Sequence, residues 1–310
     1  MSKPLILASS RVRPYSANAQ MGIATMAAEA GVHGGFMGAP WPQGALASAA
    51  VALSEQGLPL CGTQIPLPPE PLVAGKRLPH WGSLDDAEER ICAVNFADQT
   101  LALARDFGCT WAYLDAFSIK LKAPVQLFVQ SFAENRWDRD RSSKVAARPL
   151  LEAALKERTQ YDERLCDAAR FTLERLARVA DNRGVMVAVG HGIGPWQFPS
   201  PREVDLLLEE FRGASLVKAH LPARLDVLQT LGLLTEERRA TLALAPFVMA
   251  TDALGLRDDL APGLGPRPLA GALKSSNGKK PEVVVVSGRS DTTTAELQAA
   301  VRLIEKLSSQ

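Results

Sequence analysis

Lys218 and His220 are the two titratable residues whose types and spacing have the clearest chemical meaning in this sequence. They close the apolar run Ala214–His220, and a separation of two residues puts both side chains on one face of a strand. A desolvated lysine can act as a base or form an imine, and histidine titrates near neutral pH. Asp252 closes the run Pro246–Asp252 and can pair with Lys218. We predict that Lys218, His220 and Asp252 are catalytic and transfer a proton next to a carbonyl group.

A second set of residues is predicted to bind the substrate: His191, Asp115, Arg257, Arg289, Trp196 and Trp41. The histidine lies in the glycine-rich segment Gly190–Gly194, whose backbone N–H groups can bind an anion. The arginines can bind a carboxylate or phosphate through two hydrogen bonds, and the tryptophans can form an aromatic wall. Each candidate also has a structural alternative: a solvated charge, a cap, a turn residue or an ordinary loop.

Short apolar runs alternate with longer segments of helical periodicity, and this alternation must position the candidate residues. The expected strands are Pro4–Ser9, Val32–Met37, Leu58–Ile65, Thr110–Phe117, Val185–Gly190, Ala214–His220, Pro246–Asp252 and Glu282–Ser287. Eight such runs with helical connections predict an α/β fold, a (β/α)8 TIM barrel whose parallel strands are buried on both faces. A doubly wound open sheet is disfavoured, because Ser9–Arg13 replaces the glycine-rich fingerprint expected after its first strand.

The whole chain, residues 1–310, is predicted to form one barrel domain with a long loop insertion at about 118–160. This insertion is irregular and charged, and it contains Asn135–Arg141. A loop of that length is usually either functional or disordered.

Composition narrows the range of partners. Lys+Arg total 35 and Asp+Glu total 34, without the basic stripe that binds a phosphate backbone, so no nucleic-acid partner is expected. No apolar run approaches the length of a membrane span, and the N-terminus lacks the pattern of a secretory signal. We expect a cytoplasmic protein with a small-molecule substrate, and we leave open a homodimer. The four cysteines are widely spaced and indicate neither a zinc site nor disulfides.

Several segments resemble the sugar-phosphate isomerase/epimerase family, the xylose-isomerase-like TIM barrels. They are the helix–glycine–strand phrases Met26–Val32, Ala102–Cys109 and Leu176–Val185, together with the loop Arg257–Gly265. The resemblance covers most of the chain and implies a barrel with its active site at the carboxyl ends of the strands.

The same resemblance implies a divalent metal, which family members hold with a glutamate, an aspartate, a histidine and a glutamate on strands five to eight. Here those positions align with Gly190, Lys218, Met249 and Ser287, none of which is a good ligand for a hard cation. A lysine at the second position would also repel the metal. We therefore predict a site without metal or other cofactor.

Three functions follow from these observations. The first is a metal-independent enzyme of isomerase or epimerase type, or a lyase or cyclase, acting by acid/base proton transfer on a small metabolite. The second is a pseudoenzyme that binds a small molecule without catalysis. The third is an ordinary metal-dependent sugar isomerase or epimerase that keeps its metal through His191, His220 and Asp252. Fold alone does not choose among them.

Overall fold

The computed structural model describes residues 4–9, 17–38, 45–67, 72–73, 76–77, 81–84, 86–119, 121–122, 141–242, 245–254, 257–265, 281–288 and 291–309. Side chains are described for most of these residues, but not for 17–23, 72–73, 76–77, 141–147, 240–241, 253–254 or 257–258.

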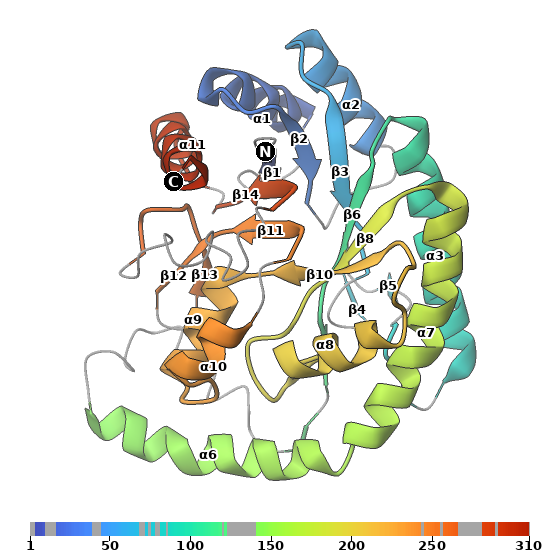
Figure 1. Ribbon diagram of the computed structural model, residues 1–310, viewed down its shortest axis with the longest axis vertical. Helices are drawn as coiled ribbons and strands as arrows, with labels where there is room; N and C mark the ends of the chain where they lie inside the picture. The colour runs from blue at the N-terminus through green and yellow to red at the C-terminus, as the bar shows by residue number, and fades with distance from the viewer. Residues whose placement is uncertain are drawn as a thin grey trace.

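Eight parallel strands close into a barrel at the centre of the molecule (Figure 1). They are β1 (Leu5–Ser9), β2 (Gly34–Met37), β3 (Leu60–Gln64), β6 (Trp111–Leu114), β8 (Met186–Val189), β10 (Leu216–His220), β11 (Phe247–Ala250) and β14 (Val283–Val286). Their order around the barrel follows the chain, and β14 pairs with β1 to close it. The predicted TIM barrel is confirmed, and each predicted strand contains one of these eight.

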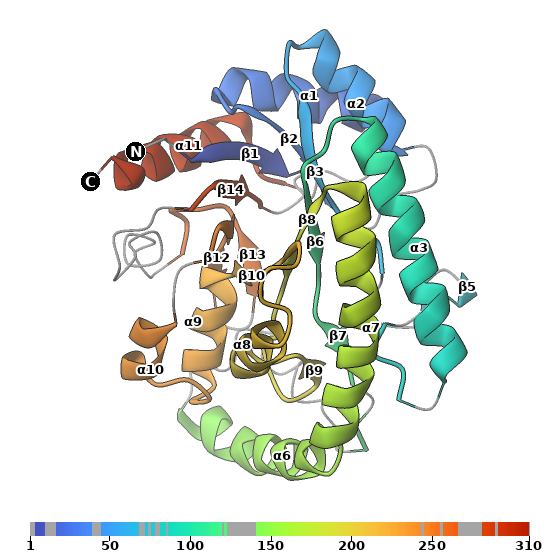
Figure 2. The same ribbon diagram turned by 45° about the vertical axis from the view of Figure 1, so that its right-hand side comes forward.

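Helices cover the outside of the barrel and continue its order (Figures 1 and 2). They are α1 (Ala17–Ala30), α2 (Ala45–Glu55), α3 (Ala87–Asp106), α7 (Asp162–Arg183), α8 (Pro201–Glu209), α9 (Pro222–Thr230), α10 (Glu236–Thr241) and α11 (Thr294–Ser308). Both views show α3 beside α7 and α11 beside α1, so the first and last helices of the chain are neighbours. No helix among the described residues has the length and apolarity needed to span a bilayer.

The insertion predicted as a loop at about 118–160 is partly helical. Its second half forms α6 (Arg141–Thr159), which lies across one end of the molecule next to α8, α9 and α10 (Figures 1 and 2). Leu151 of α6 packs with Trp196 and with Val227 of α9. A helix can bury one apolar face in this way, which an irregular loop cannot do. Residues 123–140 lie outside the described part of the chain.

Short strands pair outside the barrel in three small antiparallel sheets. These sheets join β4 (Leu72–Val73) to β5 (Lys76–Arg77), β7 (Phe117–Ser118) to β9 (Gln197–Phe198), and β12 (Asp252–Leu254) to β13 (Arg257–Leu260). The second of them connects the segments that follow β6 and β8, and so fixes the two loops relative to each other.

The residues between β10 and β11 form two helices, α9 and α10, with a break between them. Gly232 has a φ of 72°, a left-handed conformation that ends a helix and that glycine adopts without strain. Thr235 then caps α10 by accepting a hydrogen bond from the backbone N–H of Arg238.

Aromatic rings fill the interior of the barrel. Phe247 stacks on Tyr113 with a centroid separation of 5.9 Å and an interplanar angle of 5°, and it also contacts Phe36 and Trp111. The cluster continues with Leu7, Ala188, Ala219, Met249 and Val285, which marks these residues as the inward-facing positions of their strands. Neighbours in the sequence such as Val248 and Val284 pack outward against the helices.

Phe247→Ala removes the ring at the centre of this cluster. We expect the free energy of unfolding to fall by about 3–5 kcal/mol, because the fully buried side chain leaves a cavity that its neighbours cannot fill. Urea denaturation measures this loss. Phe107 is 36% exposed, so Phe107→Ala is the matched control. It should lower the free energy of unfolding by much less than Phe247→Ala does.

Candidate functional site

The carboxyl ends of the eight strands form the mouth of the barrel, where enzymes of this architecture carry their sites. Strand register identifies which side chains line it. Gln64 and Ala188 pair with the inward-facing Tyr113 on its two neighbouring strands. Asp115 and Gly190 are each two residues further on, so they continue the same inward row at the mouth.

Asp115 is held in the mouth by hydrogen bonds and an ion pair. Its Oδ1 accepts hydrogen bonds from the Tyr113 hydroxyl and from the Ala116 backbone N–H, both at 2.8 Å. Arg224 adds a two-pronged ion pair, with its guanidinium nitrogens 2.5 Å from Oδ1 and 3.1 Å from Oδ2. The side chains of Asp115 and Arg224 are only 13% and 12% exposed. A largely buried ion pair of this kind needs such hydrogen bonds to offset its desolvation.

Arg224 also donates to the backbone oxygen of His191 at 2.7 Å, so one guanidinium connects the segments that follow β6, β8 and β10. Arg224 is not among the site residues predicted from the sequence. A signal was present, because Pro222 is a typical first residue of a helix and places Arg224 in the first turn of α9. Side chains in a helix lean toward its N-terminus, which here means toward the mouth.

Gly190 is the position at which the resemblance implies a metal-binding glutamate. A Cβ atom on residue 190 would be 2.3 Å from the Tyr113 hydroxyl oxygen and 2.8 Å from two ring carbons. Tyr113 therefore occupies the space that any side chain at 190 would need. With the tyrosine in this position, residue 190 cannot carry a carboxylate.

His191, predicted to bind substrate, is 1% exposed. Its Nδ1 is 3.0 Å from the Gly192 carbonyl oxygen, which can only accept, so Nδ1 carries the hydrogen. Nε2 is buried and has no hydrogen-bond partner in the described structure. The pKa of His191 is lowered to about 3, mainly by burial and also by the charges of Arg224, Lys218 and His220, while the Gly192 hydrogen bond acts in the opposite direction. The imidazole is neutral at physiological pH.

The glycine segment around His191 was predicted to offer N–H groups to an anion, and the structure contradicts this for three of them. The amides of Gly190 and Gly192 donate to the backbone oxygens of Leu114 and Pro199, and the amide of Ile193 donates to Oε1 of Gln197. These donors hold the loop in place because buried backbone groups need partners within the protein.

Lys218 and His220 share one face of β10, as predicted, but it is the outward face. Ala219 belongs to the interior cluster, and the Lys218 ammonium is 2.6 Å from Asp205 of α8. The predicted position of both residues in the mouth is therefore wrong. Alternation fixes which residues share a face but not which face points inward. Burial lowers the pKa of His220 to about 3, assisted by the charges of Lys218 and Arg239.

Asp252 does not pair with Lys218. Its Oδ2 accepts backbone hydrogen bonds from Gly263 at 2.6 Å and Gly265 at 2.9 Å, which fastens the loop after β13. Burial raises the pKa of this carboxyl, and the hydrogen bonds from the loop backbone lower it.

Of the remaining candidates, Trp196 does not form a pocket wall. Its ring is buried among Leu151, Ala223, Val227 and Leu231. Trp41, Arg289 and the side chain of Arg257 lie outside the described residues.

The donor set at the mouth does not fit the divalent metal that the resemblance implies. Gly190 has no side chain and no room for one, Lys218 faces away, and Met249 and Ser287 are poor ligands for a hard cation. Within the part of the chain that the structure describes, no three His, Cys, Asp or Glu side chains are grouped so that they could hold a metal ion. The chemistry considered below therefore uses protein side chains alone.

Comparisons with known proteins show the fold. No family model matches the sequence, and no curated protein matches it either. Among solved structures, 3-keto-D-glucoside 4-epimerase from E. coli is similar with a TM-score of 0.60 and 14% identity, over 99% of this chain and 100% of that one. D-allulose 3-epimerase from Methylomonas sp., solved with D-allulose, has a TM-score of 0.58 and 12% identity over 99% and 94%. L-ribulose 3-epimerase has a TM-score of 0.58 and 14% identity over 100% and 93%.

These similarities show that the chain shares the TIM-barrel fold of these structures. At such low identity they establish the architecture of the chain, and they leave its substrate and reaction to the residues of the site.

Gly190→Ala tests the packing of the mouth. We expect it to lower the free energy of unfolding by about 1–3 kcal/mol, because the new methyl group overlaps the Tyr113 hydroxyl. In a double-mutant cycle, Tyr113→Phe should recover part of this loss. Gly31→Ala is the control, because Gly31 has a φ of 75° and no atom lies within 4 Å of the added Cβ. The loss in the free energy of unfolding that it causes should be the same with and without Tyr113→Phe.

The two buried histidines predict how stability depends on pH. Their pKa is about 3 in the folded protein, below the ordinary value of 6.5, so the unfolded chain binds more protons between these limits. Stability should then be full above about pH 6.5 and fall as the pH drops, by up to about 1.4 kcal/mol per pH unit for each histidine. His220→Gln should flatten the profile measured by urea unfolding from pH 7 to 5. A profile parallel to that of the wild type would contradict this assignment.

Proposed function

We propose that the chain is an isomerase- or epimerase-like enzyme that transfers a proton next to the carbonyl group of a small polar metabolite in the mouth of the barrel. The observation that carries this proposal is the match of nearly the whole chain to three sugar epimerases. The mouth supports it, since an aspartate, an arginine and a tyrosine converge there. A lyase or cyclase reaction could start with the same proton transfer.

Proton transfer beside a carbonyl needs a group that accepts the proton and a group that stabilises the negative charge on oxygen. We assign the first role to Asp115 and the second to Arg224. The Arg224 guanidinium lies against both carboxylate oxygens of Asp115, so the two groups are already side by side. Tyr113 fixes the carboxylate through its 2.8 Å hydrogen bond. We propose that the reaction needs no metal, because the residues at the ends of β8, β10, β11 and β14 do not form a ligand set.

We rank these mouth residues ahead of Lys218, His220 and Asp252, the catalytic set that the sequence predicts. Lys218 is occupied by Asp205, and Asp252 is occupied by backbone amides. His220 is buried and neutral on the outward face of β10. The catalytic role of these three residues is a separate prediction that their own variants test.

One observation favours a second function, the binding of a small molecule without catalysis. Each carboxylate discussed above is already engaged by an arginine, a lysine or backbone amides, and the two histidines have low pKa values that make them weak bases. An enzyme base is usually tuned in the opposite direction, toward the working pH. A direct assay of proton exchange separates the two functions.

The experiment is deuterium incorporation from D₂O, followed by NMR, with D-allulose, L-ribulose and a 3-keto-glucoside as substrates. We expect deuterium at the carbon next to the carbonyl, at the same rate with and without EDTA. Asp115→Asn should slow the exchange by about 10²- to 10⁴-fold, the usual worth of a general base. Arg302→Gln, at an exposed position on α11, is the control, and circular dichroism confirms that each variant is folded.

Other outcomes would redirect the assignment. Exchange abolished by EDTA, together with stoichiometric metal in the purified protein by mass spectrometry, would overturn the metal-free proposal. Exchange lost in Lys218→Met or His220→Gln, but kept in Asp115→Asn, would move catalysis to the outer face of β10. Calorimetric binding of these sugars without any exchange would establish the binding protein instead.

A further inference from the structure

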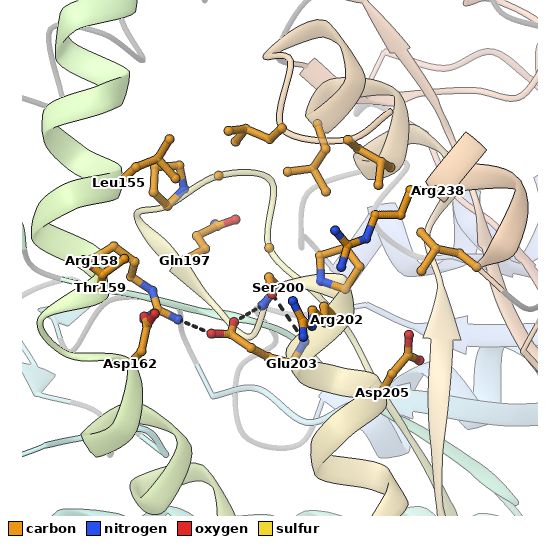
Figure 3. Close-up of a pocket in the computed structure, with 18 of the residues that line it drawn as sticks. Leu155, Arg158, Thr159, Asp162, Gln197, Ser200, Arg202, Glu203, Asp205 and Arg238 are labelled. Atoms are coloured by element: carbon orange, nitrogen blue, oxygen red, sulfur yellow. Dashed lines mark hydrogen bonds and ion pairs between the residues drawn. The ribbon is translucent and has the colours of Figure 1, made fainter. Parts of the chain in front are cut away.

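We propose that a cavity outside the barrel, between α6, α8 and α10, binds a small ligand that combines an anionic group with an apolar body (Figure 3). The cavity has a volume of about 620 Å³, within the range of about 300–1,000 Å³ that small-molecule sites occupy. Its walls come from the end of α6, the loop after β8, the start of α8 and the α9–α10 segment. Asp115, Arg224 and Tyr113 do not line it, so this site is separate from the mouth.

Each acidic side chain in the cavity wall is paired with a cation, and Glu203 and Asp162 share one guanidinium. Glu203 Oε1 is 2.8 Å from the Arg158 guanidinium, and Asp162 contacts the same guanidinium. Asp205 is paired with Lys218 at 2.6 Å from outside the cavity. A ligand entering this space therefore meets little uncompensated negative charge.

The basic side chains leave a surplus of positive charge. Lys156 of α6, Arg202 of α8 and Arg238 of α10 all line the cavity and are exposed. Within the described residues, neither the Lys156 ammonium nor the Arg202 guanidinium makes an ion pair. Figure 3 shows Arg202 and Arg238 on one side of the cavity and Arg158 and Asp162 on the other. Two arginines on one wall suit a carboxylate or a phosphate, which they bind in a planar, two-pronged geometry.

Much of the remaining lining is apolar, and Thr159, Gln197 and Ser200 are the uncharged polar side chains in it. The apolar residues are Leu155, Pro195, Pro201, Leu228, Leu233, Leu234 and Leu242. A sugar would leave this leucine surface unpaired, whereas a hydrocarbon or aromatic body would remove it from water. The lining thus points to an amphiphilic organic acid or to the phosphate ester of an apolar alcohol.

The floor of the cavity is rigid before any ligand arrives. Arg158 is 6% exposed and lies over the Phe198 ring at 5.0 Å while it binds Glu203. Glu203 also completes the capping box of α8 by accepting the Ser200 backbone N–H at 2.7 Å. A preformed floor lowers the entropy that binding must overcome.

The test is isothermal titration calorimetry on the full chain with four probes: octanoate, octyl phosphate, inorganic phosphate and 1-octanol. We expect octanoate or octyl phosphate to bind at least about tenfold more tightly than inorganic phosphate or octanol, because each control lacks one half of the ligand. The ratio of the first two affinities tells a carboxylate site from a phosphate site. The double variant Arg202→Gln/Arg238→Gln should weaken the tighter probe by about tenfold or more, since both guanidinium contacts are lost.

Arg302→Gln is again the matched control, because it removes an exposed helical arginine that does not line the cavity and should leave the affinity unchanged. Thermal unfolding verifies that the double variant is folded. Equal binding of octanol and octanoate, unchanged affinity in the folded double variant, or no binding of any probe at millimolar concentration would each overturn the proposal. None of these outcomes bears on the deuterium exchange in the mouth.

Discussion

The ion pair between Asp115 and Arg224 is the contact on which the mouth of the barrel depends. Two charges with little solvent exposure are costly unless hydrogen bonds complete their surroundings, and Tyr113 and the Ala116 amide supply those bonds. Arg224 extends the network to the His191 carbonyl. Segments from β6, β8 and the start of α9 are thereby fixed at one point, which gives the mouth a single geometry.

This network and a metal site of the family's kind compete for the same space. A glutamate at position 190 would have to pass through the Tyr113 hydroxyl, and loss of that hydroxyl would remove one of the donors to Asp115. Glycine at 190 is therefore coupled to tyrosine at 113. Tyr113 also stacks on Phe247 in the interior cluster, so the same ring connects the mouth to the packed interior of the barrel.

The barrel could be predicted from the sequence because parallel strands buried on both faces appear as apolar runs, and the residues between them have helical spacing. Which face of β10 points into the barrel could not be predicted. One face carries the apolar Val217, Ala219 and Leu221 and the other the polar Lys218 and His220, and either face could line the mouth. Only packing against Asp205 of α8 decides that the lysine points outward. The partnership of Asp115 with Arg224 was hidden for another reason: it joins residues 109 positions apart.

The mouth and the outer cavity differ in electrostatic character, and this difference gives them separate tasks. In the mouth, Arg224 is balanced by Asp115, so a neutral polar metabolite can approach without a large desolvation cost. In the cavity Glu203 and Asp162 share Arg158 and Asp205 pairs with Lys218, and Lys156 and Arg202 remain to attract an anion. The loop after β8 touches both places, since the His191 carbonyl holds Arg224 while Gly192 and Gln197 line the cavity. A ligand in the cavity therefore packs against the segment that positions the guanidinium of the mouth, and the two sites share one wall.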